Sequence, residues 1–302
     1  GGGGGGAKRN DQCGARRGEE PRGGGPIFSG FEKEGTTTLK PPPQMLVRVI
    51  CFDARAPNVQ HILRRLPRAK PAAARRPRPQ DFRRLSSYGK FLMASCRARQ
   101  THAHYSYEGA FGLLLASLAL WQECARRKEP MLVFEENSEL RDEAELAECL
   151  EVFRRAQLDF LMLHTWGPFP DVCRRGAQSA ALDVAATIAS TAGGGAVRRL
   201  TWPHMSTKAY AISPRFATHL VALLRSRIDN LHIDWLLCGE ALAPSNRARP
   251  FRAALYRAPA RDNGIVRVIR KPYAGIRHDT PLPNMNVATH VLQSALGALP
   301  AA

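Results

Sequence analysis

The sequence predicts an α/β fold, in which helices cover a central sheet. Two observations lead to this prediction. Short runs of β-branched and apolar residues alternate along the chain with longer amphipathic segments, which is the pattern of strands that alternate with helices. The chain has 302 residues, of which 44% are hydrophobic, so it can bury the core that such a sheet requires.

The two ends of the chain differ in composition from its middle. Residues 1–44 are rich in Gly, Pro and charged residues, so we predict a disordered leader. We predict a folded domain over residues 45–280 and a C-terminal tail over residues 281–302. Because the first residue is not Met, the natural N-terminus can lie further upstream, and we leave the localisation open between the cytoplasm and an endomembrane.

The domain is predicted to begin with a strand and a helix. Residues 45–52 (Met-Leu-Val-Arg-Val-Ile-Cys-Phe) are a β-branched apolar run, which is typical of a buried strand. Asn58 is a suitable N-cap for a helix that runs to about Leu66. Four prolines then fall within residues 67–79, which predicts a loop.

The middle of the domain contains its most apolar segment. Residues 109–128 predict a core helix whose basic end suits the negative end of the helix dipole. Residues 131–134 (Met-Leu-Val-Phe) predict a second buried strand. Asn137 or Ser138 then caps a predicted helix over about residues 139–157, which has an acidic start and a basic end.

The second half of the domain continues the alternation. Two helices are predicted, one over residues 180–191 and one that begins at Ser213 and ends near Arg225. Gly193, Gly194 and Gly195 predict a flexible break. The remaining predicted strands are residues 159–163, 208–212 and 265–269.

The net charge is strongly positive but unevenly distributed. The chain has 44 Lys and Arg against 26 Asp and Glu, a net charge of +18, which favours a partner that carries phosphates. The excess lies in residues 61–99 and 198–302, whereas residues 100–160 hold 6 cations and 12 acids. Because no helix-turn-helix, zinc-finger or RNP signature is present, we expect no specific nucleic-acid partner.

Seven cysteines are spread along the chain without a CxxC pair. This spacing excludes a zinc ribbon or a thioredoxin-type motif. An odd number of cysteines in a chain of this length also argues against a disulfide framework and favours a reducing compartment.

The most informative local pattern is an acidic motif that directly follows a buried strand. Glu135, Glu136 and Asn137 come after residues 131–134, at the end of a strand where α/β sheets bind ligands. Carboxylate and amide oxygens are hard donors that suit Mg²⁺ or Mn²⁺, and such an ion can bridge a diphosphate. The alternative interpretation is a solvated turn at the start of an acidic helix.

Six segments of the chain, in order, resemble glycosyltransferase family 25, which includes lipooligosaccharide-biosynthesis and collagen galactosyltransferases. The resemblance spans roughly residues 45–240. The segments are residues 49–53 (Val-Ile-Cys-Phe-Asp) with Arg55, 109–118 (Gly-Ala-Phe-Gly-Leu-Leu-Leu-Ala-Ser-Leu), 134–137 (Phe-Glu-Glu-Asn), 158–163 (Leu-Asp-Phe-Leu-Met-Leu), 207–213 (Thr-Lys-Ala-Tyr-Ala-Ile-Ser) and 232–235 (His-Ile-Asp-Trp).

The resemblance implies a GT-A-like nucleotide-sugar-binding fold with a mixed central sheet flanked by helices. It also implies inverting transfer of a hexose, galactose being the expected sugar, from a UDP-hexose to a hydroxyl group of a glycan or glycoprotein acceptor. A divalent metal, Mn²⁺ or Mg²⁺, would assist this transfer.

The resemblance also assigns roles to individual residues. Glu136 and Asn137 would hold the metal, with Glu135 as a catalytic residue that supports them. Asp234 would be the general base or a further metal ligand, and the alternative for Asp234 is a helix N-cap. The donor-binding residues would be Val49, Arg55 and Trp166, although packing within a loop also explains Trp166.

The chain departs from the family pattern at several of these positions. The Glu-Asp-Asp triplet of the family is here Glu135-Glu136-Asn137, and its Glu, Ser and His in the second segment are Ala110, Ala116 and Ser117. A neutral Asn brings less charge to a cation than Asp does. These departures leave a catalytically degenerate glycosyltransferase-like binding protein as one alternative. The net charge of +18 leaves a basic nucleic-acid-binding protein as another.

Overall fold

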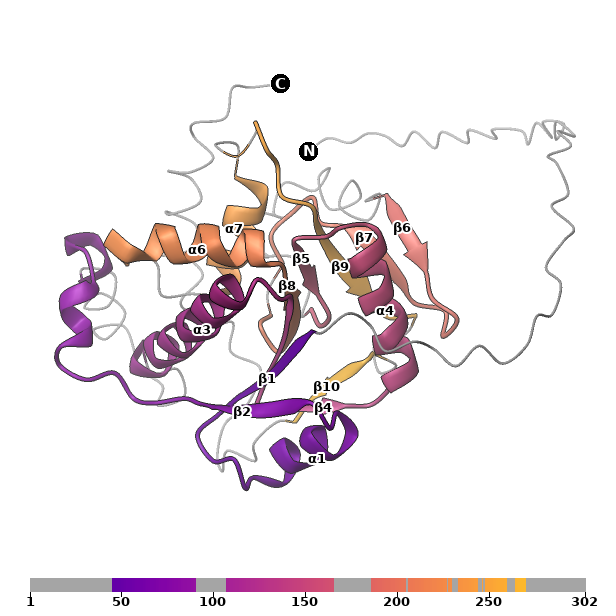
Figure 1. The fold of residues 1–302 in the computed structure, drawn as a ribbon, viewed down its shortest axis with the longest axis horizontal. Coiled ribbons are helices and arrows are strands. Elements are labelled where there is room, and N and C mark those ends of the chain that lie inside the picture. The colour runs from indigo at the N-terminus through magenta and orange to yellow at the C-terminus, as the bar shows by residue number, and fades with distance from the viewer. Residues whose placement is uncertain are drawn as a thin grey trace, which may run out of the picture. The chain divides into compact units, whose positions relative to one another are not determined.

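A mixed sheet of eight strands forms the centre of the described part of the chain (Figure 1). The computed structural model describes residues 45–90, 107–165, 186–204, 206–226, 228–229, 233–243, 246, 248–259 and 264–269. From one edge of the sheet to the other, the strands are β2 (Ala69–Ala73), β1 (Leu46–Cys51), β3 (Met131–Glu135), β8 (Ala209–Ile212), β5 (Phe160–Met162), β9 (Ala253–Arg257), β7 (Ala196–Arg199) and β6 (Thr187–Ser190).

The strand directions bring distant parts of the chain to one edge of the sheet. Strand β1 is parallel to β2 and β3, whereas β8 lies between β3 and β5 and is antiparallel to both. Strand β5 is parallel to its other neighbour, β9. The carboxyl ends of β1, β3 and β5 and the amino end of β8 therefore lie along the same edge of the sheet, the one formed by strand ends.

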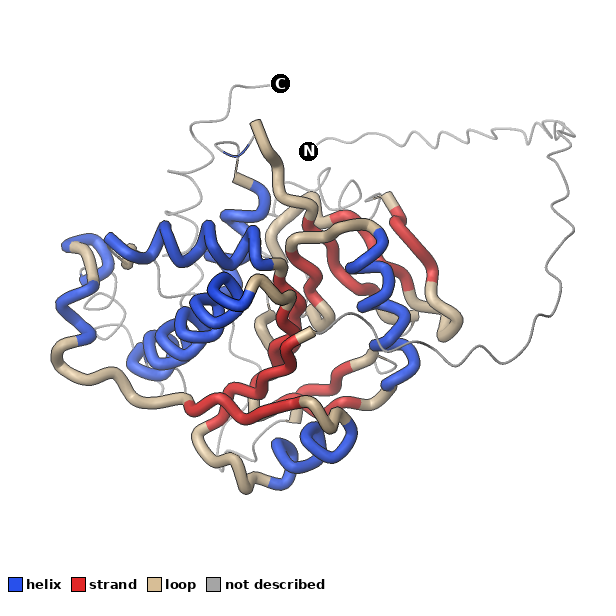
Figure 2. Tube along the Cα trace, viewed as in Figure 1, coloured by secondary structure: helices blue, strands red, loops and turns tan. Residues whose placement is uncertain are grey.

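Helices cover both faces of the sheet, as Figures 1 and 2 show. On one face lie α3 (Tyr107–Arg127), α6 (Pro214–Ser226) and α7 (Ile233–Leu242), which share one hydrophobic cluster. On the other face lie α1 (Pro57–Arg65) and α4 (Glu143–Arg155), with a two-stranded sheet of β4 (Ser138–Leu140) and β10 (Val266–Val268). A short 3-10 helix, η1 (Asp81–Arg84), precedes α3.

The period-2 alternation of strand side chains explains why the sheet has two cores. In β3, Met131 and Val133 belong to the cluster of α3, α6 and α7, whereas Leu132 and Phe134 belong to the cluster of α1 and α4. All four side chains are at most 1% exposed, so β3 is buried on both faces, as its uninterrupted apolar sequence predicts.

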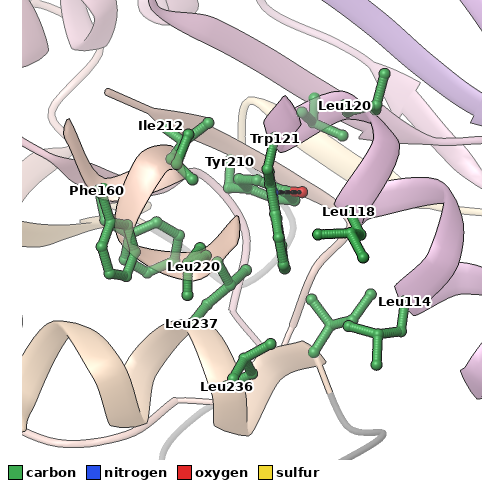
Figure 3. Packing of buried hydrophobic residues seen from close by; sticks show 14 of the residues in the cluster. Leu114, Leu118, Leu120, Trp121, Phe160, Tyr210, Ile212, Leu220, Leu236 and Leu237 are labelled. Carbon is green, nitrogen blue, oxygen red and sulfur yellow. Dashed lines mark hydrogen bonds between the residues drawn. The ribbon is translucent and has the colours of Figure 1, made fainter. Parts of the chain in front are cut away.

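The first core contains a buried polar contact between α3 and the sheet (Figure 3). The indole N–H of Trp121 donates a hydrogen bond of 3.2 Å to the hydroxyl oxygen of Tyr210 in β8. Trp121 is 0% and Tyr210 1% exposed, and Figure 3 shows Leu118 of α3 and Ile212 of β8 near this pair. This contact gives two buried polar groups a hydrogen-bond partner within the core.

Most of the predicted elements are confirmed. The five predicted strands correspond to β1, β3, β5, β8 and β10. The helices predicted near Asn58, over residues 109–128 and from Ser213 correspond to α1, α3 and α6. Asn58 is not the N-cap of α1, however, because the helix begins at Pro57 after Ala56 and the Asn58 side chain donates to the Glu136 carbonyl. The α/β fold class with a mixed, helix-flanked sheet is therefore correct.

Three element predictions are wrong in part. Within residues 67–79, β2 pairs in parallel with β1, and its Pro71 is tolerated because β2 lies at the edge of the sheet. The helix predicted over residues 139–157 begins at Glu143, because Ser138–Leu140 pairs with β10. The helix predicted over residues 180–191 is strand β6 at Thr187–Ser190, and residues 180–185 lie outside the described residues.

All described residues belong to one compact unit, Pro41–Ala302, and the other unit, Gly1–Lys40, contains none of them. The predicted leader and tail therefore remain predictions. Among the described helices, none is long and apolar enough to cross a membrane. Four of the seven cysteines lie in the described part, and all four are buried and free: Cys51, Cys124, Cys149 and Cys238.

Candidate functional site

The acidic motif lies where β3 ends, beside the residues that precede β8. Glu135 is the last residue of β3 and is 7% exposed. Its carboxylate accepts a hydrogen bond from the Thr207 hydroxyl and forms an ion pair with the Lys208 ammonium group. The backbone N–H of Glu135 donates to the Lys208 carbonyl over 3.0 Å, which fixes the two strands at this point.

The next two residues form a turn that leads into β4, so Asn137 does not cap a helix. The backbone N–H of Phe52, directly after β1, donates to Glu136 Oε2 over 2.9 Å. The side-chain amide of Asn58 donates to the Glu136 carbonyl. Asn137 Oδ1 is buried and has no hydrogen-bond partner among the described residues.

Two histidines lie at the same edge of the sheet, after β5 and before β8. His164 Nδ1 is 2.7 Å from Ser206 Oγ, and His204 Nδ1 is 3.0 Å from Thr165 Oγ1. Burial, and to a lesser extent the nearby Lys208 charge, lowers the pKa of His164 to about 4. Burial alone lowers the pKa of His204 to about 4, so both rings are neutral at pH 7.

Asp234 lies in the first turn of α7, inside the helix and not at its N-cap. The pKa of Asp234 is raised to about 6, chiefly by burial; the Glu135 charge also raises it, and the Lys208 charge lowers it. Asp234 therefore lies within the electrostatic influence of both Glu135 and Lys208. One turn later in α7, the Cys238 thiol contacts the His204 carbonyl at 3.4 Å, which ties the helix to the segment before β8.

The two predicted catalytic residues, Glu135 and Asp234, are 99 positions apart in the sequence, yet in the fold the Glu135 charge acts on the Asp234 carboxyl group. We call the group formed by Glu135, His164, Ser206, Thr207, Lys208 and Asp234 the polar cluster. It combines a carboxylate whose pKa lies near neutrality with an ammonium group and neutral histidines, which suits acid–base chemistry beside an anion.

The predicted donor-binding residues are placed differently from one another. Val49, in the middle of β1, is 0% exposed and packs in the hydrophobic cluster of α1 and α4, so core packing accounts for its side chain. Arg55 is exposed in the turn between β1 and α1, where its N–H donates to Asp53 Oδ1 over 2.8 Å. Trp166 lies outside the described residues. Donor binding by these three residues remains a prediction.

The described residues fit the predicted Mn²⁺ or Mg²⁺ poorly. The unsatisfied Asn137 Oδ1 could be a metal ligand, but the Glu135 carboxylate is already neutralised by Lys208. Within the described ranges, no group of three or more His, Cys, Asp or Glu side chains could hold a metal ion. Both Glu135 carboxylate oxygens are engaged by Thr207 and Lys208, and Glu136 Oε2 accepts from the Phe52 N–H, so no catalytic step below passes through a metal.

The sequence predictions did not include Lys208, His164 or Ser206 as site residues. Lys208 is part of a predicted strand and of the resembling segment 207–213, but the residues around it give no sign of its carboxylate partner. The strand order is the signal that would have identified Lys208. Because β8 runs antiparallel between β3 and β5, the residues before β8 lie beside the carboxyl ends of β3 and β5. The sequence alone does not give this order.

We compared the sequence with models of known protein families, and none of them matches it. A comparison with curated proteins also gave no match. The functional conclusions below therefore depend on the site residues, their contacts and the resemblance of the six sequence segments.

Proposed function

We propose that the protein is a glycosyltransferase that transfers a hexose, galactose being the expected sugar, from a nucleotide-sugar donor to a hydroxyl group of a glycan or glycoprotein acceptor. The observation that carries this proposal is the ion pair of Glu135 and Lys208 at one edge of the sheet, whose charges both act on Asp234. A GT-A-like fold is part of the proposal, and the mixed, helix-flanked sheet supports it.

The proposed reaction is a direct displacement with Asp234 as general base. The acceptor oxygen forms a bond to C1 of the sugar while the bond from C1 to the diphosphate oxygen breaks, and the hydroxyl proton passes to Asp234. A pKa of about 6 leaves most of Asp234 ionised at pH 7 and still basic enough to accept a proton. Attack from the face opposite the leaving group inverts the anomeric carbon.

The surroundings of the polar cluster support a nucleotide as the leaving group. Phe52 directly follows β1 and is 61% exposed, and its backbone N–H donates to Glu136 Oε2. An exposed aromatic ring beside a phosphate-binding edge can stack on a nucleobase. The neutral His164 and His204 can each offer a ring N–H to a sugar or phosphate oxygen.

A panel of UDP-sugars tests the proposal. The purified chain should release UDP from one donor, and addition of the acceptor should accelerate this release. Asp234→Asn should lower kcat by about 100-fold or more while donor affinity changes little, because the base acts on the acceptor and not on the donor. Glu143→Gln is the matched control, since Glu143 is an exposed carboxylate of α4.

Nucleotide-sugar binding without transfer is the second candidate function. The pairing of Glu135 with Lys208 favours it, because a carboxylate that is already neutralised contributes less to a reaction. The same panel separates the two functions. Donor binding without turnover, with or without acceptor, would support the binding protein, whereas absence of donor binding under every condition would contradict both functions.

A further inference from the structure

We infer that the Lys208 ammonium group supplies the fixed positive charge that binds the donor diphosphate, so that this site binds a nucleoside diphosphate without a divalent cation. The inference rests on the proposed function for its choice of ligand. It concerns Lys208, to which the resemblance to the glycosyltransferase family assigns no role in the site.

The fold places this ammonium group at the ligand-binding edge of the sheet. Lys208 directly precedes β8, whose amino end lies beside the carboxyl ends of β3 and β5. The Lys208 side chain is 20% exposed, whereas the Glu135 side chain that it contacts is 9% exposed. The ammonium group is therefore the more accessible member of the pair, and a bound anion can reach it.

The same contacts leave little room for a divalent ion. The two carboxylate oxygens of Glu135 are engaged, Oε1 by the Thr207 hydroxyl and Oε2 by the Lys208 ammonium group. A cation that binds Glu135 would have to displace the ammonium group or tolerate its positive charge within a few ångströms. The diphosphate, by contrast, is attracted by that charge.

The neighbouring titratable groups leave Lys208 as the main source of positive charge within the polar cluster. His164 and His204 are neutral at pH 7 because their pKa values are lowered to about 4. Glu135 and Asp234 are the acids that act on the same region, and Glu135 offsets the Lys208 charge directly. Lysine binds phosphate as a compact point charge, so its strength depends on how far Glu135 neutralises it.

Glu135 can either offset the Lys208 charge or support a metal ion, and these two roles predict opposite changes in diphosphate affinity when the Glu135 charge is removed. If Lys208 is the diphosphate ligand, Glu135→Gln removes a competing charge and should strengthen binding by about three- to tenfold. If Glu135 supports a metal that binds the diphosphate, the same substitution should weaken binding. Gln retains the shape of Glu and can still accept the Thr207 hydrogen bond.

Calorimetry with the full chain tests the inference, with UDP and inorganic diphosphate as the probes. Wild-type affinity for both probes should change less than about twofold between EDTA and excess Mn²⁺. Lys208→Ala should weaken binding of both probes by about tenfold or more. Lys208→Arg should retain part of the wild-type affinity, because the guanidinium group keeps a positive charge that attracts phosphate. Lys70→Ala is the matched control, because Lys70 is an exposed lysine of the edge strand β2.

Several results would overturn the inference. These are binding that appears only with Mn²⁺, a Lys208→Ala variant that binds as tightly as the wild type, weaker binding by Glu135→Gln, and no binding of either probe. If Lys208→Ala does not fold, as judged by circular dichroism, the sign of the Glu135→Gln effect decides. Metal-independent UDP binding without any sugar transfer would sustain this inference while contradicting the proposed transferase.

Discussion

Asp234 is the residue whose charge state matters most for both stability and function. Burial is the largest reason for its raised pKa of about 6, and the charges of Glu135 and Lys208 act on it in opposite directions. An unfolded Asp ionises near pH 4, so between about pH 4 and pH 6 the folded chain holds a proton that the unfolded chain releases. The folded state thus loses stability from this group as the pH rises through that window.

Replacing Asp234 with Asn should therefore stabilise the protein more at pH 7.5 than at pH 4. A full two-unit shift corresponds to about 3 kcal/mol, but Asp234 is partly exposed, and solvent screening reduces the expected difference to about 1 kcal/mol. Urea unfolding of both proteins at the two pH values measures it. An equal difference in the free energy of unfolding at both pH values would contradict the prediction.

At the scale of single residues, the sequence identified carboxylates but not their partners. Glu135 was recognisable because it follows a buried strand, and Asp234 because it lies in a segment that resembles a known family. Lys208 could not be recognised, because its role depends on a contact with a residue 73 positions earlier in the chain. Val49 was predicted at the donor site, yet its side chain lies in the core.

At the scale of elements, helix α4 shows how a local cap and a distant pairing together set where a helix begins. The Asp142 side chain accepts a hydrogen bond from the Glu145 N–H over 2.8 Å, and Ser138–Leu140 is held as a strand by β10. Helix-forming residues before Asp142 are thereby kept out of the helix. The acidic first turn also suits the positive end of the helix dipole.

Removing this cap should destabilise the protein measurably. Asp142→Ala leaves the Glu145 N–H without its partner, and we expect a loss of about 1 kcal/mol in the free energy of unfolding. Asp142→Asn is the control, because Asn is an equally good N-cap and should change stability much less. Urea unfolding at neutral pH provides the comparison, and equal losses in the two variants would argue against the cap.

Helix α3 depends on a glycine where the chain before η1 approaches it closely. A Cβ atom on Gly112 would lie 2.6 Å from the Arg75 carbonyl oxygen, which is a backbone atom that cannot turn aside. Gly112→Ala should therefore lower the free energy of unfolding by about 1–3 kcal/mol. In Gly239→Ala, a Cβ would meet nothing within 4 Å, so this α7 variant should gain up to about 1 kcal/mol.

Thermal or urea unfolding of the two glycine variants gives the test, since both lie within helices and differ mainly in the space around them. A higher free energy of unfolding in both variants would mean that the loop at Arg75 moves away from α3 at no cost in stability. A lower free energy of unfolding in both would mean that the effect comes from replacing a helical glycine and not from the contact with Arg75.

Elements with a strong local pattern were the ones that the sequence could predict. The β-branched and large apolar residues of β1 and β3 and the long apolar stretch of α3 are such patterns. Strands β4, β7 and β9 were missed because each is short and polar or Ala-rich, and each is held by pairing with a distant strand. Strand β2 was likewise missed because it contains Pro71, which is tolerated there because β2 is the outermost strand of the sheet.

At the scale of the whole molecule, the net charge of +18 acts on any polyanion, irrespective of the polar cluster. The acidic stretch of residues 100–160 contains Glu135, so the charge that attracts anions lies mostly elsewhere in the sequence. A long-range attraction of this kind raises encounter rates and is screened by salt.

Binding to a generic DNA duplex should therefore be weak, indifferent to sequence and strongly dependent on salt. We expect affinity to fall by about tenfold or more between 50 and 200 mM salt, because phosphate contacts release counterions. Fluorescence anisotropy with two duplexes of unrelated sequence measures this. Tight binding at 200 mM salt that distinguishes the duplexes would instead support the nucleic-acid-binding alternative.

The insertion of β8 between β3 and β5 has a consequence for how the chain folds. Both neighbours are made before β8 as the chain is synthesised, so each presents an unpaired edge until residues 209–212 arrive. Such edges invite pairing with other chains, and closing the long intervening loop slows folding. The arrival of β8 joins β3 to β5 and delivers Lys208 to Glu135 in one event. Newly made chains should thus be most prone to aggregation just before the site assembles.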